Sequence, residues 1–186
     1  MFISSVPGSQ AIWFLRPLFR LQQRKYGQEL RAAAVWARVP LLYTALTLFY
    51  SALERRRSHL PPPLRALLQT YVSQLNHCAF CIDLNAANAA KRYGTLDTVQ
   101  AVSGWEVSEV FDEIERVCLE YAREITLTDG QVDQLLINRL RQHFDETGVI
   151  ELTALISFQN MSSKFNAALD IESMGLCQLP LKKQAP

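Results

Sequence analysis

The sequence predicts an all-α protein, a helical bundle that forms a single domain. Glycine is scarce, with 7 residues in a chain of 186, and no segment alternates apolar with polar residues long enough to suggest a strand. Apolar residues instead recur at spacings of three and four along the chain. A chain of this length with 49% hydrophobic residues can bury its own core. We divide it into N-terminal helices at 1–57, a core at 58–170 and a tail at 171–186.

The N-terminal region predicts neither a secretory signal nor a membrane span. Arg16 and Pro17 interrupt its apolar patch, and no charged stretch precedes a small-residue cleavage site. The uncharged run 39–53 is shorter than the roughly 20 residues that cross a bilayer, so we interpret it as a buried helix that begins at Pro40. We therefore expect a cytoplasmic protein in a reducing compartment, where close cysteine pairs are more often catalytic, redox-sensing or metal-binding than structural.

Helix boundaries follow from proline, glycine and capping residues. The proline cluster in 58–63 starts a helix that runs from Leu64 towards Asn76, and the pattern continues until Gly94 ends it. Thr128 with Gln131 forms a capping-box pattern, which predicts another start, and a further start is expected near Asp145. The remaining helices are expected at 95–102, 108–124, 128–144 and 146–169. Gly175 and Pro180 are expected to end the ordered structure.

The net charge and the apolar side chains of the sequence indicate which kinds of macromolecule the protein binds. The formal net charge is +1 with both signs interspersed, so we expect no nucleic-acid partner. The first third of the chain has more large apolar side chains than one short helix layer needs, which favours a homo-oligomer, although packing within the chain is an alternative. These side chains are Trp13, Phe14, Leu18, Phe19, Trp36, Tyr43, Phe49 and Tyr50.

The strongest chemical signal is the dithiol motif Cys78-Ala79-Phe80-Cys81. A thiolate attacks peroxides and disulfides, and helix N-termini lower thiol pKa values. If Asn76 caps a new helix, both cysteines lie in its first turn with their sulfurs side by side. His77 then precedes Cys81 by four residues and Asn85 follows it by four, on one face. An imidazole there could deprotonate Cys81 or protonate a leaving group.

Other interpretations of these residues stay open. The CxxC pair could be half of a zinc site, but Cys118 and Cys177 are lone cysteines without a second CxxC or a nearby histidine pair. We therefore predict no metal and no cofactor. Cys118 is interpreted as a small buried hydrophobe and Cys177 as incidental in the tail. The dithiol could also be an inert part of the core, and His77 a structural residue at a helix start.

The segment 64–83, LRALLQTYVSQLNHCAFCID, resembles the core of the carboxymuconolactone decarboxylase-like, alkylhydroperoxidase D (AhpD)-like family. The resemblance depends on the Val-Ser-Gln-Leu-Asn run that leads into CxxC. It extends more loosely to Tyr26-Gly27, to 37–40 and to Phe158-Gln159-Asn160. The resemblance implies an all-helical subunit in trimers or hexamers, thiol peroxidase activity in the alkylhydroperoxidase members, and no haem or flavin.

By this resemblance, Cys81 is the peroxidatic thiol that becomes a sulfenic acid, Cys78 resolves it to a disulfide, and a dithiol protein is the reductant. With His77 as candidate base, the predicted function is a thiol-dependent peroxidase or disulfide oxidoreductase acting on a peroxide or another small molecule. The alternatives are a non-catalytic redox sensor whose cysteine pair switches a subunit interface, and an oligomeric family member that binds a small molecule between its helices.

Two positions depart from the family pattern. The peroxidase motif usually has a glutamate twelve residues before the first cysteine and a histidine four residues after the second, and these form a proton relay. This sequence has Ala66 and Asn85 there, and neither transfers a proton. His77 is the candidate substitute for the histidine, and Glu120 or Glu124 for the carboxylate.

Overall fold

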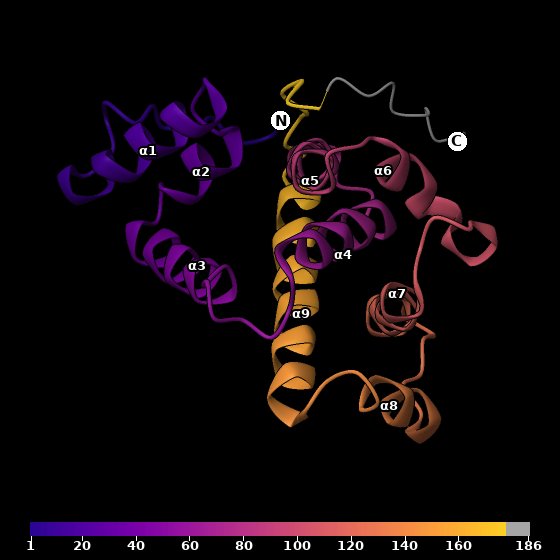
Figure 1. Cartoon of the computed structure of the whole chain (residues 1–186). Helices are drawn as coiled ribbons and strands as arrows, with labels where there is room; N and C mark the ends of the chain where they lie inside the picture. Colours follow the sequence, from indigo (N-terminus) through magenta and orange to yellow (C-terminus); the bar gives the residue numbers. More distant parts are fainter. Residues whose placement is uncertain (178–186) are drawn as a thin grey trace.

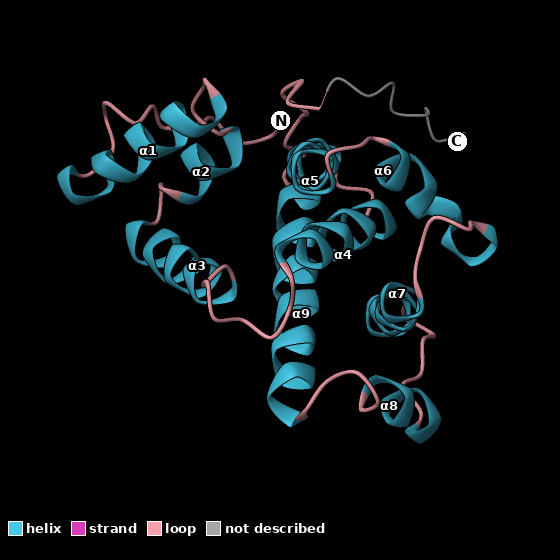
Figure 2. Cartoon of the chain, viewed as in Figure 1, coloured by secondary structure: helices cyan, strands magenta, loops and turns pink. Residues whose placement is uncertain are grey.

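The structure is a computed structural model that describes residues 1–177. Within these residues every regular element is a helix, which confirms the predicted all-α class (Figures 1 and 2). The elements are η1 (Trp13–Leu15), α1 (Arg16–Tyr26), α2 (Arg31–Trp36), α3 (Pro40–Leu53), α4 (Pro62–Leu75), α5 (Ala79–Tyr93), α6 (Asp97–Ala101), η2 (Val102–Val107), α7 (Glu113–Thr126), α8 (Gln134–Leu140) and α9 (Glu146–Ala168).

The long helix α9 runs through the middle of the molecule, and α4 and α5 pack against it (Figure 1). On one side, α4, α7 and α9 enclose the main hydrophobic core, to which α8 and η2 add side chains. On the other side, α1, α2 and α3 form an outer layer over α5 and α9. A second, smaller core lies between this layer and α5, and it contains Cys78 and Cys81. The cysteine pair therefore lies where the N-terminal helices meet the bundle.

Aromatic contacts attach the outer layer to the end and middle of α9. Trp36 at the end of α2 stacks on Phe165, with ring centroids 3.7 Å apart. Phe49 of α3 meets Phe158 edge to face, with centroids 5.3 Å apart. Offset and edge-to-face aromatic pairs stabilise a contact beyond the area they bury. None of the described helices, α3 included, is long and apolar enough to cross a membrane.

Three predicted helix boundaries are confirmed. Pro61 precedes α4, and prolines occupy its first positions, where no backbone N–H is needed. Asp145 caps α9 by accepting a 2.7 Å hydrogen bond from the Gly148 backbone nitrogen. Gly94 ends α5 in the left-handed conformation, with φ of 74°. The starts of α4 and α9 and the end of the cysteine helix α5 are thus encoded locally.

The helix start expected at Thr128 is wrong. Residues 127–130 form a turn, closed by a 3.2 Å hydrogen bond from the Gly130 nitrogen to the Leu127 carbonyl. A Cβ atom at Gly130 would collide with the Glu124 carbonyl oxygen, so the chain passes too close there for a side chain. The observed caps are aspartates. Asp112 forms a capping box at the start of α7, and Asp133 caps α8 by accepting a hydrogen bond from the backbone. The single helix expected over 128–144 is therefore the short α8.

The described part of the tail is anchored to α5. Asp83, which is buried, accepts hydrogen bonds from the backbone nitrogens of Met174 at 2.7 Å and Cys177 at 2.6 Å. The Ser173 hydroxyl donates to the same carboxylate at 3.1 Å. The chain thus stays packed two residues past Gly175, and Pro180, the other expected end, lies outside the described residues.

Candidate functional site

The cysteine helix begins two residues later than the sequence suggested. Asn76 ends α4 rather than starting α5, and its Nδ2 donates to the Val72 carbonyl at 3.0 Å and to Asn160 Oδ1 at 2.7 Å. His77 follows in the left-handed conformation, with φ of 52°. Cys78 is the N-cap of α5, because its sulfur accepts a 3.3 Å hydrogen bond from the Cys81 backbone nitrogen.

This start changes the position of His77. The face argument requires His77 to be helical, but it lies in the turn before α5 and is exposed. It is not one of the residues that line the cavity beside Cys81. The same argument does place Asn85 one turn after Cys81 within α5, and Asn85 lines that cavity. A role for His77 as a base stays a prediction.

The two thiols are buried and electrostatically unequal. Cys78 is 0% exposed and Cys81 3%, and both are free. A hydrogen bond from Cys78 lowers the pKa of Cys81 against the opposing effect of burial, and hydrogen bonds from Asn166, Ser163 and Gln159 lower it further. The hydrogen bond to Cys81, together with burial, raises the pKa of Cys78. Of the two thiols, Cys81 is therefore the one that ionises first.

A chain of neutral hydrogen bonds surrounds Cys81. Asn166 Nδ2 donates to Cys81 Sγ at 3.2 Å. Gln159 Nε2 donates to Ser163 Oγ at 2.8 Å and to Ser73 Oγ at 3.0 Å, and Asn85 Nδ2 donates to Ser73 Oγ at 3.0 Å. These amide and hydroxyl side chains come from α4, α5 and α9. None of them is ionisable, so they stabilise a thiolate but do not take up its proton.

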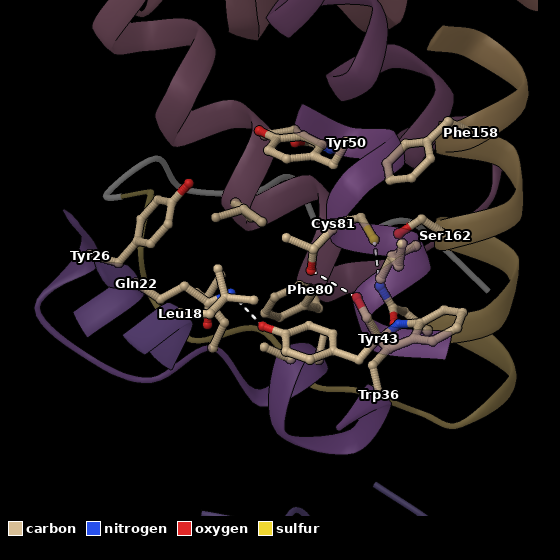
Figure 3. Close-up of a pocket in the computed structure, with 18 of the residues that line it drawn as sticks. Leu18, Gln22, Tyr26, Trp36, Tyr43, Tyr50, Phe80, Cys81, Phe158 and Ser162 are labelled. Atoms are coloured by element: carbon tan, nitrogen blue, oxygen red, sulfur yellow. Dashed lines mark hydrogen bonds between the residues drawn. The ribbon is translucent and has the colours of Figure 1, made fainter. Parts of the chain in front are cut away.

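A cavity of about 290 Å³ opens beside Cys81, between α1–α3 on one wall and α5 and α9 on the other. Figure 3 shows aromatic side chains on both sides of the sulfur. Within the described chain, Lys25 is the only charged residue in the lining. The aromatic residues of the lining are Tyr26, Trp36, Tyr43, Tyr50, Phe80 and Phe158. The site therefore combines a thiol of lowered pKa with a mostly hydrocarbon surface.

The two positions that depart from the family pattern have structural roles. Ala66 is fully buried on α4, in a small apolar cluster with Ala86, Ala89, Val99 and Cys177. Asn85 fixes the position of Ser73.

The candidate carboxylates are engaged elsewhere. Glu120 of α7 pairs with Arg139 at 2.6 Å, and Glu124 accepts a 2.9 Å hydrogen bond from the Gln131 backbone nitrogen. Neither carboxylate lines the cavity. Cys118 is buried in the main core, and burial together with nearby carboxylates raises its pKa to about 12. Among the described residues, no group of three or more His, Cys, Asp or Glu side chains could hold a metal ion.

Sequence reasoning missed Ser73, Gln159, Ser163 and Asn166. A signal was present, because Gln159, Ser163 and Asn166 lie at positions i, i+4 and i+7 of α9 and so share one face. All three are buried. A row of polar residues on an otherwise apolar helix face indicates a buried polar network. The sequence does not indicate that this network surrounds a cysteine sulfur.

The chain is similar to known proteins in sequence and in fold. The sequence model of the carboxymuconolactone decarboxylase family matches residues 40–124, which include the cysteine pair. The uncharacterized protein YnjA of Escherichia coli K12 is 40% identical over 177 residues, which cover 95% of this chain and 97% of YnjA.

Among solved structures, an uncharacterized peroxidase-related protein with an AhpD core from Ralstonia eutropha JMP134 superposes with a TM-score of 0.85. It has 16% identity and covers 93% of this chain and 92% of its own. A cysteine-to-alanine variant of the debrominase Bmp8, in complex with 2,3,4-tribromopyrrole, has a TM-score of 0.83, 20% identity and coverage of 95% and 93%. The chain therefore belongs to the carboxymuconolactone decarboxylase family, and it has the fold of the AhpD core.

Proposed function

We propose that this protein is a thiol-dependent peroxidase that reduces a small organic hydroperoxide with the Cys78 and Cys81 dithiol. The observation that carries the proposal is the asymmetry of the pair, in which hydrogen bonds favour the thiolate on Cys81 and the proton on Cys78. Only Cys81 of the two lines the cavity, so the activated sulfur is also the accessible one. Family membership and the AhpD-like fold support the same reaction class.

The reaction needs two steps. The Cys81 thiolate attacks the terminal peroxide oxygen, so that an S–O bond forms, the O–O bond breaks and an alkoxide departs. The alkoxide takes a proton and leaves as the alcohol, while Cys81 becomes a sulfenic acid. The sulfur of Cys78 then attacks Cys81, which releases hydroxide to be protonated to water and leaves a disulfide. A dithiol protein returns both cysteines to the reduced state.

Cys78 supplies the proton that the missing relay would have given. Its thiol is hydrogen-bonded to Cys81, and its raised pKa keeps the proton on it until the sulfur anion is consumed. Loss of that proton also makes Cys78 a thiolate, which is the form that attacks the sulfenic acid. One residue thus acts as acid in the first step and as nucleophile in the second. His77, exposed in the turn before α5, stays a candidate for exchanging protons with solvent.

The cavity favours a neutral, largely apolar substrate with a ring or short branched chain. Its walls are aromatic and aliphatic, and the described lining contains no carboxylate. A volume of about 290 Å³ is at the small end of ligand pockets. A bulky lipid hydroperoxide would not fit inside, whereas an aryl hydroperoxide such as cumene hydroperoxide has suitable size and polarity.

Reductive dehalogenation is the second candidate, because this fold with the same helical arrangement is found in a debrominase crystallised with a bromopyrrole. The net reaction takes a halogenated ring and two thiols to the dehalogenated ring, a disulfide and hydrogen halide. The aromatic cavity walls suit a flat ring. The same dithiol would supply the two electrons.

The test uses reduced protein and single turnovers. Cumene hydroperoxide and 2,3,4-tribromopyrrole are added separately, and loss of substrate, release of bromide and the thiol state of each cysteine are followed by mass spectrometry. We expect alcohol formation with a disulfide between Cys78 and Cys81, no reaction in Cys81→Ser, and an accumulated sulfenic acid in Cys78→Ser. Bromide release alone would establish the second candidate. Unreactive thiols with both compounds would refute both.

Three further parts of the proposal carry over expectations from the sequence. They are a dithiol protein as reductant, a cytoplasmic location, and assembly into trimers or hexamers. Turnover with a thioredoxin-type dithiol but not with a monothiol checks the first. Fractionation of cells and the mass of the native protein check the other two.

A further inference from the structure

Helix α3 is apolar on two opposite faces, and only one of them is covered. Its inner face carries Tyr43, Leu46 and Tyr50, which line the cavity. Its outer face carries Leu41, Ala45, Leu48 and Ala52, all exposed, with Leu41 at 79% and Leu48 at 67%. These four residues, which we call the outer stripe, recur at spacings of four, three and four and so form one straight row.

The outer stripe is complementary to itself when it is reversed. Large and small side chains alternate along it, leucine followed by alanine twice. Around a two-fold axis that crosses the helix between residues 46 and 47, Leu41 of one copy faces Ala52 of the other, and Ala45 faces Leu48. Each leucine then packs against an alanine, which lets the two helices approach closely. A parallel arrangement would instead place leucine against leucine and alanine against alanine.

The exposed area and the charges fit such a contact. Leu42 and Phe49 flank the outer stripe at 52% and 45% exposure. Together with the stripe they expose on the order of 500 Å² of apolar surface, which exceeds the few hundred Å² usual in one patch of a monomer and is over half of the roughly 800 Å² per partner in a standard interface. No residue of α3 is charged. The charged residues nearest to its two ends, Arg38, Glu54 and Arg55, are bonded within their own subunit, to Ser4, Arg92 and Glu151 respectively.

We propose that two copies of this chain pair through the outer stripe, with their α3 helices antiparallel about a two-fold axis. The contact is isologous, so it produces an even number of subunits and is compatible with a hexamer but not with an isolated trimer. Because α3 is also a wall of the cavity, the second copy supports from outside the helix that holds Tyr43 and Tyr50 against the Cys81 site. The inference does not depend on which reaction the dithiol performs.

The first test measures the native mass by sedimentation at micromolar concentration. We expect an even-numbered oligomer for the natural sequence. Leu48→Glu places a carboxylate against an alanine in each half of the contact and should weaken association by about 100-fold or more. Leu135→Glu is the matched control, because Leu135 on α8 is also 67% exposed and lies outside the outer stripe. A monomeric natural protein, or an oligomer that Leu48→Glu leaves intact, would overturn the proposal.

The second test measures the register. Leu41→Cys and Ala52→Cys variants are mixed and treated with a short bismaleimide. We expect covalent dimers in the mixture and not in either variant alone, because residues 41 and 52 face each other only across the antiparallel pair. All four natural cysteines are buried, and the natural protein gives the background. Equal cross-linking by Leu41→Cys alone would indicate parallel helices and contradict the proposed geometry.

Discussion

Replacement of Asn166 by leucine should raise the pKa of Cys81. Asn166 Nδ2 lies 3.2 Å from the sulfur, and the residue is only 2% exposed, so solvent does not supply another donor. A hydrogen bond to a charged group contributes about 1.5 to 3 kcal/mol. Because one pKa unit corresponds to about 1.4 kcal/mol, we expect a rise of about one to two units. At a pH below the natural pKa, the thiolate fraction then falls about 10- to 100-fold.

The assay is the rate of Cys81 alkylation by iodoacetamide as a function of pH, read from the Cys81 peptide by mass spectrometry. Thr153→Val is the control, because Thr153 lies on the same helix but its hydroxyl bonds to Tyr121 Oη at 2.8 Å and not to the sulfur. The midpoint should move upward in Asn166→Leu and stay in place in Thr153→Val. An unchanged midpoint in Asn166→Leu would refute the role of the amide as a thiolate donor.

Three other changes test separate parts of the structure. His77→Asn keeps a residue that tolerates positive φ and tests the predicted base. Peroxide turnover within about twofold is expected if Cys78 supplies the proton, which the position of His77 outside the cavity favours, whereas a loss of about 10²-fold or more, the size usual for a general base, would confirm His77 as the base. Burial raises the pKa of Glu151, but hydrogen bonds from Ser58 and His59 outweigh this effect and lower the pKa. Glu151→Gln should therefore reduce the melting temperature at pH 6, and the difference from the natural protein should vanish as the pH falls through the lowered pKa of Glu151. The difference should also become smaller as the pH rises through the raised pKa of His59. Asp83→Asn should lower the free energy of unfolding by about 2 kcal/mol and speed amide exchange at Met174, which a tail held by other contacts would not show.

The sequence was sufficient for most of the helix starts and insufficient for the start of α8 and for the turn that starts α5. Prolines before α4 and the aspartate before α9 are local signals, and both are used as expected. Asn76 is ambiguous, because asparagine is common at both ends of helices. Its hydrogen bond to Asn160, 84 residues away, joins α4 to α9 at this point. No local pattern contains that contact, so the boundary was misplaced by two residues.

The sequence predicted the two cysteines of the candidate site but not the side chains that surround them. The CxxC spacing alone indicates adjacent thiols. The order of their pKa values depends on donors from α9, and the cavity depends on α1–α3 lying against α5 and α9. Both are tertiary arrangements between segments far apart in the sequence. The resemblance to the family supplied the cysteine roles. It did not indicate which side chains surround Cys81 here, because the usual relay residues are absent and neutral side chains lie there instead.

Ser73 fixes the direction of the hydrogen bonds around Cys81. Its hydroxyl proton is donated to the Gln69 carbonyl at 2.5 Å, so its oxygen must accept from both Asn85 and Gln159. Gln159 in turn donates to Ser163, whose own proton is thereby free to point at the sulfur. The dipoles are aligned before any substrate arrives, and little reorganisation is needed when charge on Cys81 moves. A change as small as Ser73→Ala removes one hydroxyl that does not contact the sulfur, yet it would free Asn85 and Gln159 to reorient and so disturb the hydrogen bonds to Cys81.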